Sequence, residues 1–209
     1  MSDLLHPSLR DGPALDAARA AWAQSRRLRL SPLLADGVPE ALLQVVRSRP
    51  FMLNASHFGE FNQLYWNLFF RPDDGDPVLD PFAAWLRGGL CALVHAITGR
   101  ALVPTSTGQA VSTLYGYGCY LDIHNDGGSG RSVAFVVGLT PGRWPPEEGG
   151  HLEFLAPKDR GLVVAERRAP GWNTLDLFDV ADDPPLHRIP MVTGQHERRA
   201  FSGWFYTPA

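Results

Sequence analysis

The sequence predicts an α+β fold that is mainly β: a double-stranded β-helix, or jelly roll, with N-terminal helices packed on its major sheet. Helical patterns dominate before residue 110, and short β-type runs separated by turn clusters dominate after it. The 21 glycines and 18 prolines are many for a helical protein and suit a turn-rich β architecture. Because no repeat or linker divides the chain, we expect one domain over residues 1–209, with a helical support layer and a short strand in 1–110 and the β-helix core in 111–209.

Three elements are expected before residue 50. Gly12-Pro13 leads into an alanine-rich helix, ALDAARAAWAQ, whose larger apolar side chains form one stripe. Residues 27–35, RLRLSPLLA, begin with alternating polar and apolar side chains and predict a short strand. Val38-Pro39 then opens a second helix, EALLQVVRS, because proline is well tolerated in a first helical turn.

The clearest helical signal runs from Asp80 to Gly99. Asp80 is a suitable N-cap, the following proline suits the first helical position, and Gly99 is a stop signal. Apolar residues cover more than one face of this helix, so we expect it to be largely buried against a sheet. The aromatic-rich segment before it, residues 52–78, follows no clear period and stays unassigned.

Seven short β-type runs follow residue 110. Turn clusters such as GGSG, PGRWPPEEGG and VADDPP separate them. This spacing is typical of a sandwich or jelly roll. The runs are VSTLYGYGCYLDI, SVAFVVGL, HLEFL, GLVVAE, TLDLFDV, LHRIPMV and RRAFSGWFY.

Composition argues against several classes of protein. The formal net charge is −3 and the chain has no run of lysines or arginines, so the basic footprint of a nucleic-acid binder is missing. The most apolar segment, residues 82–97, is broken by an arginine and two glycines and is too short for a membrane span. The N-terminus lacks a signal-peptide pattern and two cysteines are too few for a disulfide framework, so we expect a cytoplasmic protein with reduced thiols.

The stretch YLDIHNDGGSG contains a candidate metal-binding pair. Residues i and i+2 of an extended chain project to the same side, so His124 and Asp126 can offer an imidazole nitrogen and a carboxylate oxygen to one ion. A second histidine from a distant strand would complete two histidines and one carboxylate with open positions, which suits non-haem Fe(II). Taken alone, the pair is better explained by a turn-capping aspartate beside a surface histidine, and the metal site is favoured only with the context given below.

The last strand carries a candidate anion site. Arg198, Ala200, Ser202 and Trp204 share one face of RRAFSGWFY, and no acidic residue accompanies the arginine on that face. A ligand carboxylate is therefore a reasonable partner for its guanidinium. The alternative is a surface salt bridge, which we expect for one of the two arginines in this run.

Together these runs resemble the Fe(II)- and 2-oxoglutarate-dependent dioxygenases, and within them the prolyl-hydroxylase-like branch. The features that carry the resemblance are YGYGCYLDIHND, GRSVAFVVGL, EEGGHLEF, NTLDLF, LHRIPMV and RRAFSGWF, in that order over residues 112–206. The resemblance implies that His124, Asp126 and His187 hold the iron. It further implies that Arg198 binds the far carboxylate of 2-oxoglutarate, with Trp204 on the same inward face.

The sequence departs from the family pattern at three strand positions: Gly138, Asp176 and Ala200, the last of which replaces a serine that often follows the cosubstrate arginine by two residues. Gly138 stands where the family often has a tyrosine that helps hold 2-oxoglutarate, so Tyr115 or Tyr117 is expected to supply that hydroxyl, the alternative being packing at the barrel rim. Asp176 lies in the middle of a strand, where a buried carboxylate needs either a polar substrate or a core arginine as partner.

Two further residues are candidate substrate contacts. His151 is expected near the barrel mouth, with a structural histidine as its alternative role. Arg131 follows the glycine-rich GGSG and is placed to meet substrate, with a plain surface role as its alternative.

The activity that the resemblance implies is hydroxylation of an unactivated C–H bond. Fe(II) is the bound metal, 2-oxoglutarate and O2 are consumed, and succinate and CO2 are the co-products. Ascorbate is expected as an accessory reductant. The expected substrate is an amino acid, a peptide or a protein residue, with proline foremost. A small-molecule natural product is the alternative substrate. A jelly-roll protein that binds metal or ligand without turnover is the alternative function. No nucleic-acid or membrane partner is expected, and the oligomeric state is left open.

Overall fold

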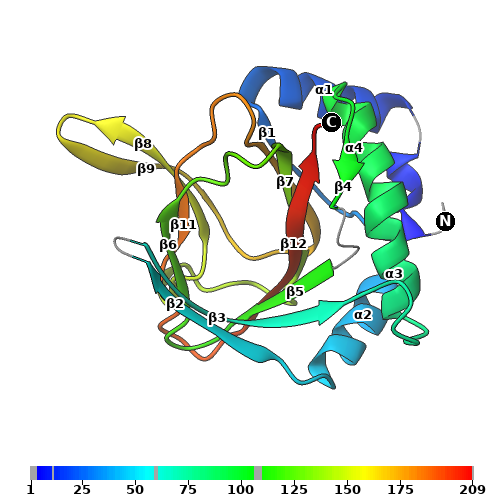
Figure 1. Ribbon diagram of the computed structural model, residues 1–209, viewed down its shortest axis with the longest axis horizontal. Coiled ribbons are helices and arrows are strands. Elements are labelled where there is room, and N and C mark those ends of the chain that lie inside the picture. Colours follow the sequence, from blue (N-terminus) through cyan, green and yellow to red (C-terminus); the bar gives the residue numbers. More distant parts are fainter. Residues whose placement is uncertain (1–3, 11, 59–60, 106–109, 209) are drawn as a thin grey trace.

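The computed structural model describes residues 4–10, 12–58, 61–105 and 110–208. Its described strands form one curled antiparallel sheet, and the helices gather on one side of that sheet (Figure 1). This arrangement confirms the predicted, mainly β fold with helices packed on the major sheet. Within the described residues, no helix combines the length and the apolar character that crossing a membrane requires.

The helices precede most of the strands in the chain. The expected N-terminal helices are present, and a short 3₁₀ turn comes before them. The predicted helix over 80–99 is a continuous run of three segments whose middle turn is π-helical. The helical elements are η2 (Pro7–Leu9), α1 (Gly12–Ser25), α2 (Val38–Arg47), α3 (Leu79–Trp85), η3 (Leu86–Leu90) and α4 (Cys91–Thr98).

The start of α3 differs from the prediction. The carboxylate of Asp76, not that of Asp80, accepts hydrogen bonds from the backbone N–H groups of Val78 and Leu79, at 2.8 and 2.9 Å. These bonds, first the one from Leu79, lower the pKa of Asp76. The helix ends as predicted, at Gly99, whose φ of 69° is the left-handed conformation that glycine adopts most readily.

The sheet order is β1-β10-β7-β12-β5-β3-β6-β11-β8-β9, with β2 paired to β3 and β4 paired to β12. The strands from β1 to β5 in this order form the major half, which faces the helices, and those from β6 to β9 form the minor half (Figure 1). The bounds are β1 (Arg27–Leu30), β2 (Met52–Phe58), β3 (Phe61–Phe70), β4 (Val103–Pro104), β5 (Ala110–Tyr115), β6 (Tyr120–His124), β7 (Arg131–Leu139), β8 (Leu152–Lys158), β9 (Gly161–Arg168), β10 (Trp172–Asp179), β11 (His187–Ile189) and β12 (Arg198–Tyr206).

The segment left unassigned from the sequence forms the β2–β3 hairpin. Residues 66–70 of β3 pair with β5 of the major half, whereas Gln63 and Leu64 pair with β6 of the minor half. One strand therefore joins both halves of the curled sheet. Its position places the side chains of this N-terminal hairpin beside the interior of the barrel.

Apolar packing separates the molecule into an outer core and an inner one. The outer core lies between the helices and the major half of the sheet, where Trp22, Phe82 and Phe201 are almost fully buried. The inner core is smaller and contains Phe154 and Phe178. Because the inner core fills only part of the barrel, space remains there for polar side chains and a ligand.

Candidate metal centre and ligand cavity

Three potential metal ligands meet inside the barrel. His124 ends β6, Asp126 follows two residues later, and His187 begins β11 directly opposite His124 in the strand pairing. The Nε2 atoms of His124 and His187 lie 3.6 and 3.4 Å from the two carboxylate oxygens of Asp126. One ligand atom from each residue lies within 4.8 Å of the other two, so a single cation can reach all three.

The backbone orients both imidazoles. Nδ1 of His124 lies 2.8 Å from the carbonyl oxygen of Asp122, and Nδ1 of His187 lies 2.9 Å from that of Pro185. A carbonyl oxygen only accepts hydrogen bonds, so each Nδ1 carries the proton. Each Nε2 is thereby left unprotonated and directed at Asp126, which is the tautomer that binds a metal.

The electrostatics of the cluster favour metal-binding protonation states. Burial, followed by the neighbouring His187, lowers the pKa of His124, which keeps its imidazole neutral. Burial alone would raise the pKa of Asp126, but the contact with His187, and the positive charge that each histidine carries only in its protonated form, hold that pKa below its usual value. The site therefore offers two neutral nitrogens and one carboxylate.

The three ligands open onto a cavity of about 480 Å³. Arg198, at the start of β12, lines it and is only 6% exposed. Its Nη1 donates to the carbonyl oxygen of Gly150 at 3.2 Å, and no described carboxylate lies within 4.0 Å of its guanidinium. Burial lowers the pKa of Arg198, but the group keeps its proton because the normal pKa is so high. The cavity thus contains a guanidinium that has no described carboxylate in direct contact with it.

Two stacked tyrosines stand beside this arginine. Tyr115, at the end of β5, lies under the Arg198 guanidinium at 5.3 Å, and its ring stacks on Tyr65 of β3 with centroids 4.9 Å apart. Burial raises the pKa of both phenols, so both hydroxyls stay protonated and can donate. Tyr65 was not among the site residues predicted from the sequence. The signal that could have found it is the alternation of Phe61, Gln63 and Tyr65, all of which line the cavity.

Arg131 and Trp204 form another part of the cavity wall. The Arg131 guanidinium carbon lies 3.9 Å above the Trp204 ring, a cation–π geometry. Nη1 of Arg131 is 4.0 Å from Oδ1 of Asp126. Both residues predicted to face the interior therefore do so, next to the candidate metal ligands.

Tyr117 lies away from the cavity, which corrects the expectation that it contacts the cosubstrate. It is 75% exposed and is absent from the cavity lining. The reason is that β5 ends at Tyr115, so the alternation of inward and outward side chains stops there. The next residues form a turn in which Gly118 has a φ of 81°.

Gly138 has no room for a side chain. A Cβ atom there would lie 2.5 Å from the carbonyl oxygen of Gly171 and 2.5 Å from Oγ1 of Thr174. These groups approach because the register between β10 and β7 shifts at Asn173, whose φ is 53°. The missing tyrosine is therefore a consequence of the local backbone of β10.

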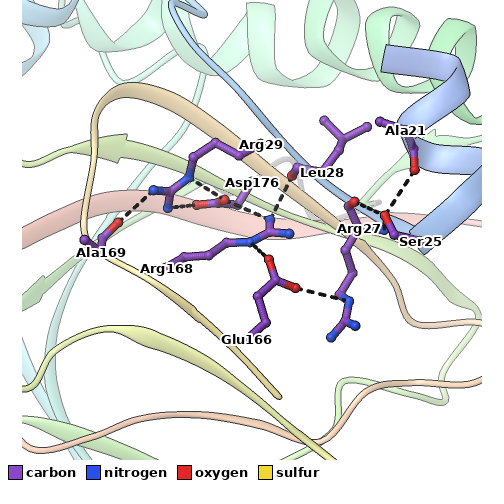
Figure 2. A network of polar contacts seen from close by, with 9 residues as sticks. All are labelled: Ala21, Ser25, Arg27, Leu28, Arg29, Glu166, Arg168, Ala169 and Asp176. Carbon is purple, nitrogen blue, oxygen red and sulfur yellow. Dashed lines mark hydrogen bonds and ion pairs between the residues drawn. The ribbon is translucent and has the colours of Figure 1, made fainter. Parts of the chain in front are cut away.

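Asp176 is a structural residue, which corrects its assignment as a substrate contact. Its carboxylate accepts two hydrogen bonds from Arg29, at 2.8 and 2.7 Å, and one from Arg168 at 3.0 Å. Figure 2 shows this network, in which Glu166 continues from Arg168 to Arg27. The ion pairs tie β1, β9 and β10 together where the two halves of the sheet approach each other.

His151 also falls outside the cavity lining. It is 5% exposed, and burial lowers its pKa, so it is a neutral interior histidine. Its burial supports the structural role, which the sequence already favours over substrate contact.

We predict that Asp176→Ala lowers the free energy of unfolding by about 3 kcal/mol, because Arg29 loses its carboxylate partner and the buried Arg168 retains only Glu166. Urea denaturation measures this change. The matched control is Asp16→Ala, which breaks the exposed Arg19–Asp16 pair on α1 and is expected to cost less than about 0.5 kcal/mol. Equal effects of the two substitutions would contradict a structural role for the network.

Several known proteins are similar to this chain in sequence. Residues 110–206 match the 2OG-Fe(II) oxygenase superfamily. The chain is 24% identical over 217 residues to prolyl 3-hydroxylase OGFOD1 of Xenopus laevis, covering 91% of this chain and 40% of that protein. It is 30% identical over 169 residues to the Mus musculus protein of the same name, covering 76% and 29%. The chain thus spans less than half the length of these curated relatives.

Solved structures share the fold. A prolyl-4-hydroxylase of Pseudomonas putida aligns with a TM-score of 0.66 and 21% identity, covering 93% of this chain and 100% of that one. A prolyl hydroxylase of Trichoplax adhaerens, solved with a peptide fragment of hypoxia inducible factor, aligns with a TM-score of 0.70 and 14% identity, covering 92% and 89%. From the matched region, the curled sheet and the convergence of His124, Asp126 and His187, we conclude that residues 110–206 of this chain belong to the 2OG-Fe(II) oxygenase superfamily.

Proposed function

We propose that this protein is an Fe(II)- and 2-oxoglutarate-dependent dioxygenase that hydroxylates a C–H bond of a peptidyl substrate, with proline as the first candidate residue. One observation carries the proposal: a cluster of two histidines and one carboxylate opens onto the same cavity as a buried arginine that has no carboxylate partner among the described residues. A metal ligand set and a receptor for an organic anion in one cavity are what this chemistry requires.

The residues present fit both groups. Two imidazole nitrogens and one carboxylate oxygen are the ligands typical of non-haem Fe(II), and they leave coordination positions open. The buried Arg198 fits a carboxylate, since a guanidinium binds one through two parallel hydrogen bonds. When bound, Fe(II) supplies the activation of O2 that couples conversion of 2-oxoglutarate to succinate and CO2 with hydroxylation of the substrate.

The protein's own side chains supply binding and orientation. His124, Asp126 and His187 would hold the metal, with each imidazole fixed by its hydrogen bond to a backbone carbonyl. Arg198 would pair with the far carboxylate of 2-oxoglutarate. Tyr115, beneath the guanidinium, is placed to donate a hydroxyl hydrogen bond to the same carboxylate.

The side chains nearer β3 and β7 are the candidates for substrate contact. Phe61 and Gln63 line the cavity from the hairpin, and Arg131 lines it from β7. Phe61 packs edge-on against His124, with ring centroids 5.6 Å apart, so a substrate that touches this ring lies next to the metal ligands. Arg131 offers a cation for a peptide carbonyl oxygen.

Several observations support a peptidyl substrate over the alternatives. The curated relatives are named prolyl 3-hydroxylases, and one structure with the same fold was solved with a peptide. A free amino acid or natural product remains the alternative substrate. A module that binds without turnover is the alternative function, and the complete metal ligand set in one cavity with Arg198 favours the enzyme over it.

We expect purified protein with Fe(II) and 2-oxoglutarate, kept anaerobic, to show the weak visible charge-transfer band of a metal-bound 2-oxo acid. His124→Ala should remove the band, and Tyr117→Phe, which alters an exposed residue, should preserve it. Under oxygen, succinate release and a mass gain of one oxygen on proline-containing peptides would identify the reaction. A wild-type protein with neither band nor succinate would refute the proposal, whereas succinate without peptide modification would redirect the search to small molecules.

A further inference from the structure

A second cavity lies on the other face of β12, behind the residues that line the barrel. Its volume is about 240 Å³, and its walls come from the end of α2, the residues after β7, and the segment leading into β12. Because neighbouring residues of a strand face opposite sides, Arg199 points into this region while Arg198 points into the barrel. Both arginines border a crevice of about 10 Å³, but each lines a different one of the two larger cavities.

Arg199 is the central cation of the second cavity. Its side chain is 9% exposed, and Nε and Nη2 contact the carboxylate of Glu197 at 3.2 and 2.7 Å. Its remaining nitrogen, Nη1, is buried and has no hydrogen-bond partner within the described part of the chain. A buried donor without a partner is rare in folded proteins and indicates that a water, ion or ligand completes it.

The other polar groups around this cavity are mainly donors. Arg47, the last residue of α2, lines it and forms no ion pair within the described residues. His196 lines it as well, and its Nδ1 is engaged by Glu148, which leaves Nε2 available. Gln195 adds a side-chain amide.

The charge of the lining is positive. Glu197 is the one carboxylate among the described lining residues, and its Oε2 atom already accepts hydrogen bonds from Nε and Nη2 of Arg199. Arg47 is left without a counter-charge. A cavity with surplus donors and an unpaired guanidinium is complementary to a small oxyanion, since charge-assisted hydrogen bonds to phosphate or carboxylate oxygens are the strongest that arginine makes.

We propose that the cavity formed by Arg47, Thr140, Gln195, His196 and Arg199 binds a small oxyanion of the phosphate type. The site is independent of the proposed dioxygenase reaction, because it opens on the opposite side of β12 from the candidate metal centre. Arg199 and Arg47 supply the charge, and the side-chain amide of Gln195 supplies a neutral donor.

Titration of the ¹⁵N-labelled protein with inorganic phosphate tests the proposal. We expect saturable chemical-shift changes for the backbone amides of Thr140, Gln195 and Glu197, with no matching change at Tyr115 or His124 in the barrel. Arg47→Gln should weaken phosphate binding about tenfold through loss of one charge-assisted contact. Arg47 is exposed at a helix end, so this variant is expected to fold. The matched control is Arg160→Gln, an exposed arginine in the β8–β9 turn, which should leave binding unchanged.

Three results would overturn the proposal. The first is the absence of saturable shifts at millimolar phosphate. The second is the confinement of the shifts to barrel residues, which would place the anion at Arg198. The third is an equal effect of the Arg47 and Arg160 substitutions, which would indicate general electrostatic attraction without a defined site.

Discussion

Replacing Asp126 with alanine is expected to weaken Fe(II) binding by more than about hundredfold and to remove 2-oxoglutarate turnover, since even groups that only support a metal ligand contribute tenfold to hundredfold. Asp126 is the one carboxylate of the candidate ligand set, and both imidazoles point their Nε2 atoms at it. Its loss would leave two neutral nitrogens, which hold Fe(II) weakly without a negative charge.

The experiment compares metal binding by Asp126→Ala and Asp122→Asn. Asp122 lies on β6, the strand that ends at His124, and its carboxylate accepts hydrogen bonds from the backbone and side chain of Asn62 at 3.1 and 2.9 Å. Its substitution therefore removes the same charge near the site without removing a proposed ligand. Anaerobic calorimetry with Fe(II) should show strong loss only for Asp126→Ala. Similar losses in both variants would mean that local charge, and not ligation, determines the affinity.

The metal ligands were accessible to sequence reasoning because two of the three are local. His124 and Asp126 are two positions apart at the end of a strand, so elementary strand geometry puts their side chains on one side. The third ligand, His187, depends on strand pairing across more than sixty positions of sequence, and geometry alone did not single it out from seven histidines. Its assignment came from the order of motifs.

The β2–β3 hairpin shows where periodicity fails. Aromatic and aliphatic residues occupy both faces of β3, because one face lines the cavity and the other lies on the outside of the sheet near α3. The usual alternation of apolar and polar residues is therefore absent over FNQLYWNLFF, although the strand is long. Because this strand was not predicted, the part of the cavity wall that it supplies, including Tyr65, was not predicted either.

The roles of Tyr117 and Asp176 depend on local structure that the sequence does not reveal. Tyr117 was expected to continue the inward face of β5, but the strand stops two residues earlier. Asp176 was unusual enough to be noticed, yet its partners Arg29 and Arg168 come from β1 and β9, the two ends of the sheet order, which are 139 residues apart in the chain. Choosing between a ligand and an arginine for such a carboxylate requires the tertiary structure.

Replacing Arg198 with methionine is expected to weaken 2-oxoglutarate binding by a factor of about 30 to 1,000, because removing one partner of a buried charge pair costs roughly 2–4 kcal/mol. Methionine keeps much of the side-chain volume and removes the charge. Arg198→Lys should give a smaller loss, since lysine retains the charge but cannot form two parallel hydrogen bonds. Calorimetric titration of 2-oxoglutarate into protein loaded with a divalent metal measures the affinity of each variant.

The same substitution separates a binding role from a structural one through its effect on folding. In the ligand-free protein, Arg198 is buried, makes a single hydrogen bond to the carbonyl of Gly150, and has no carboxylate within 4.0 Å among the described residues. Its burial therefore costs folding energy that only a bound anion offsets. Arg198→Met is accordingly expected to leave the free energy of unfolding unchanged or to raise it, while 2-oxoglutarate no longer stabilises the variant. A large loss of stability combined with unaltered 2-oxoglutarate affinity would show that the arginine serves the fold and that the cosubstrate binds elsewhere.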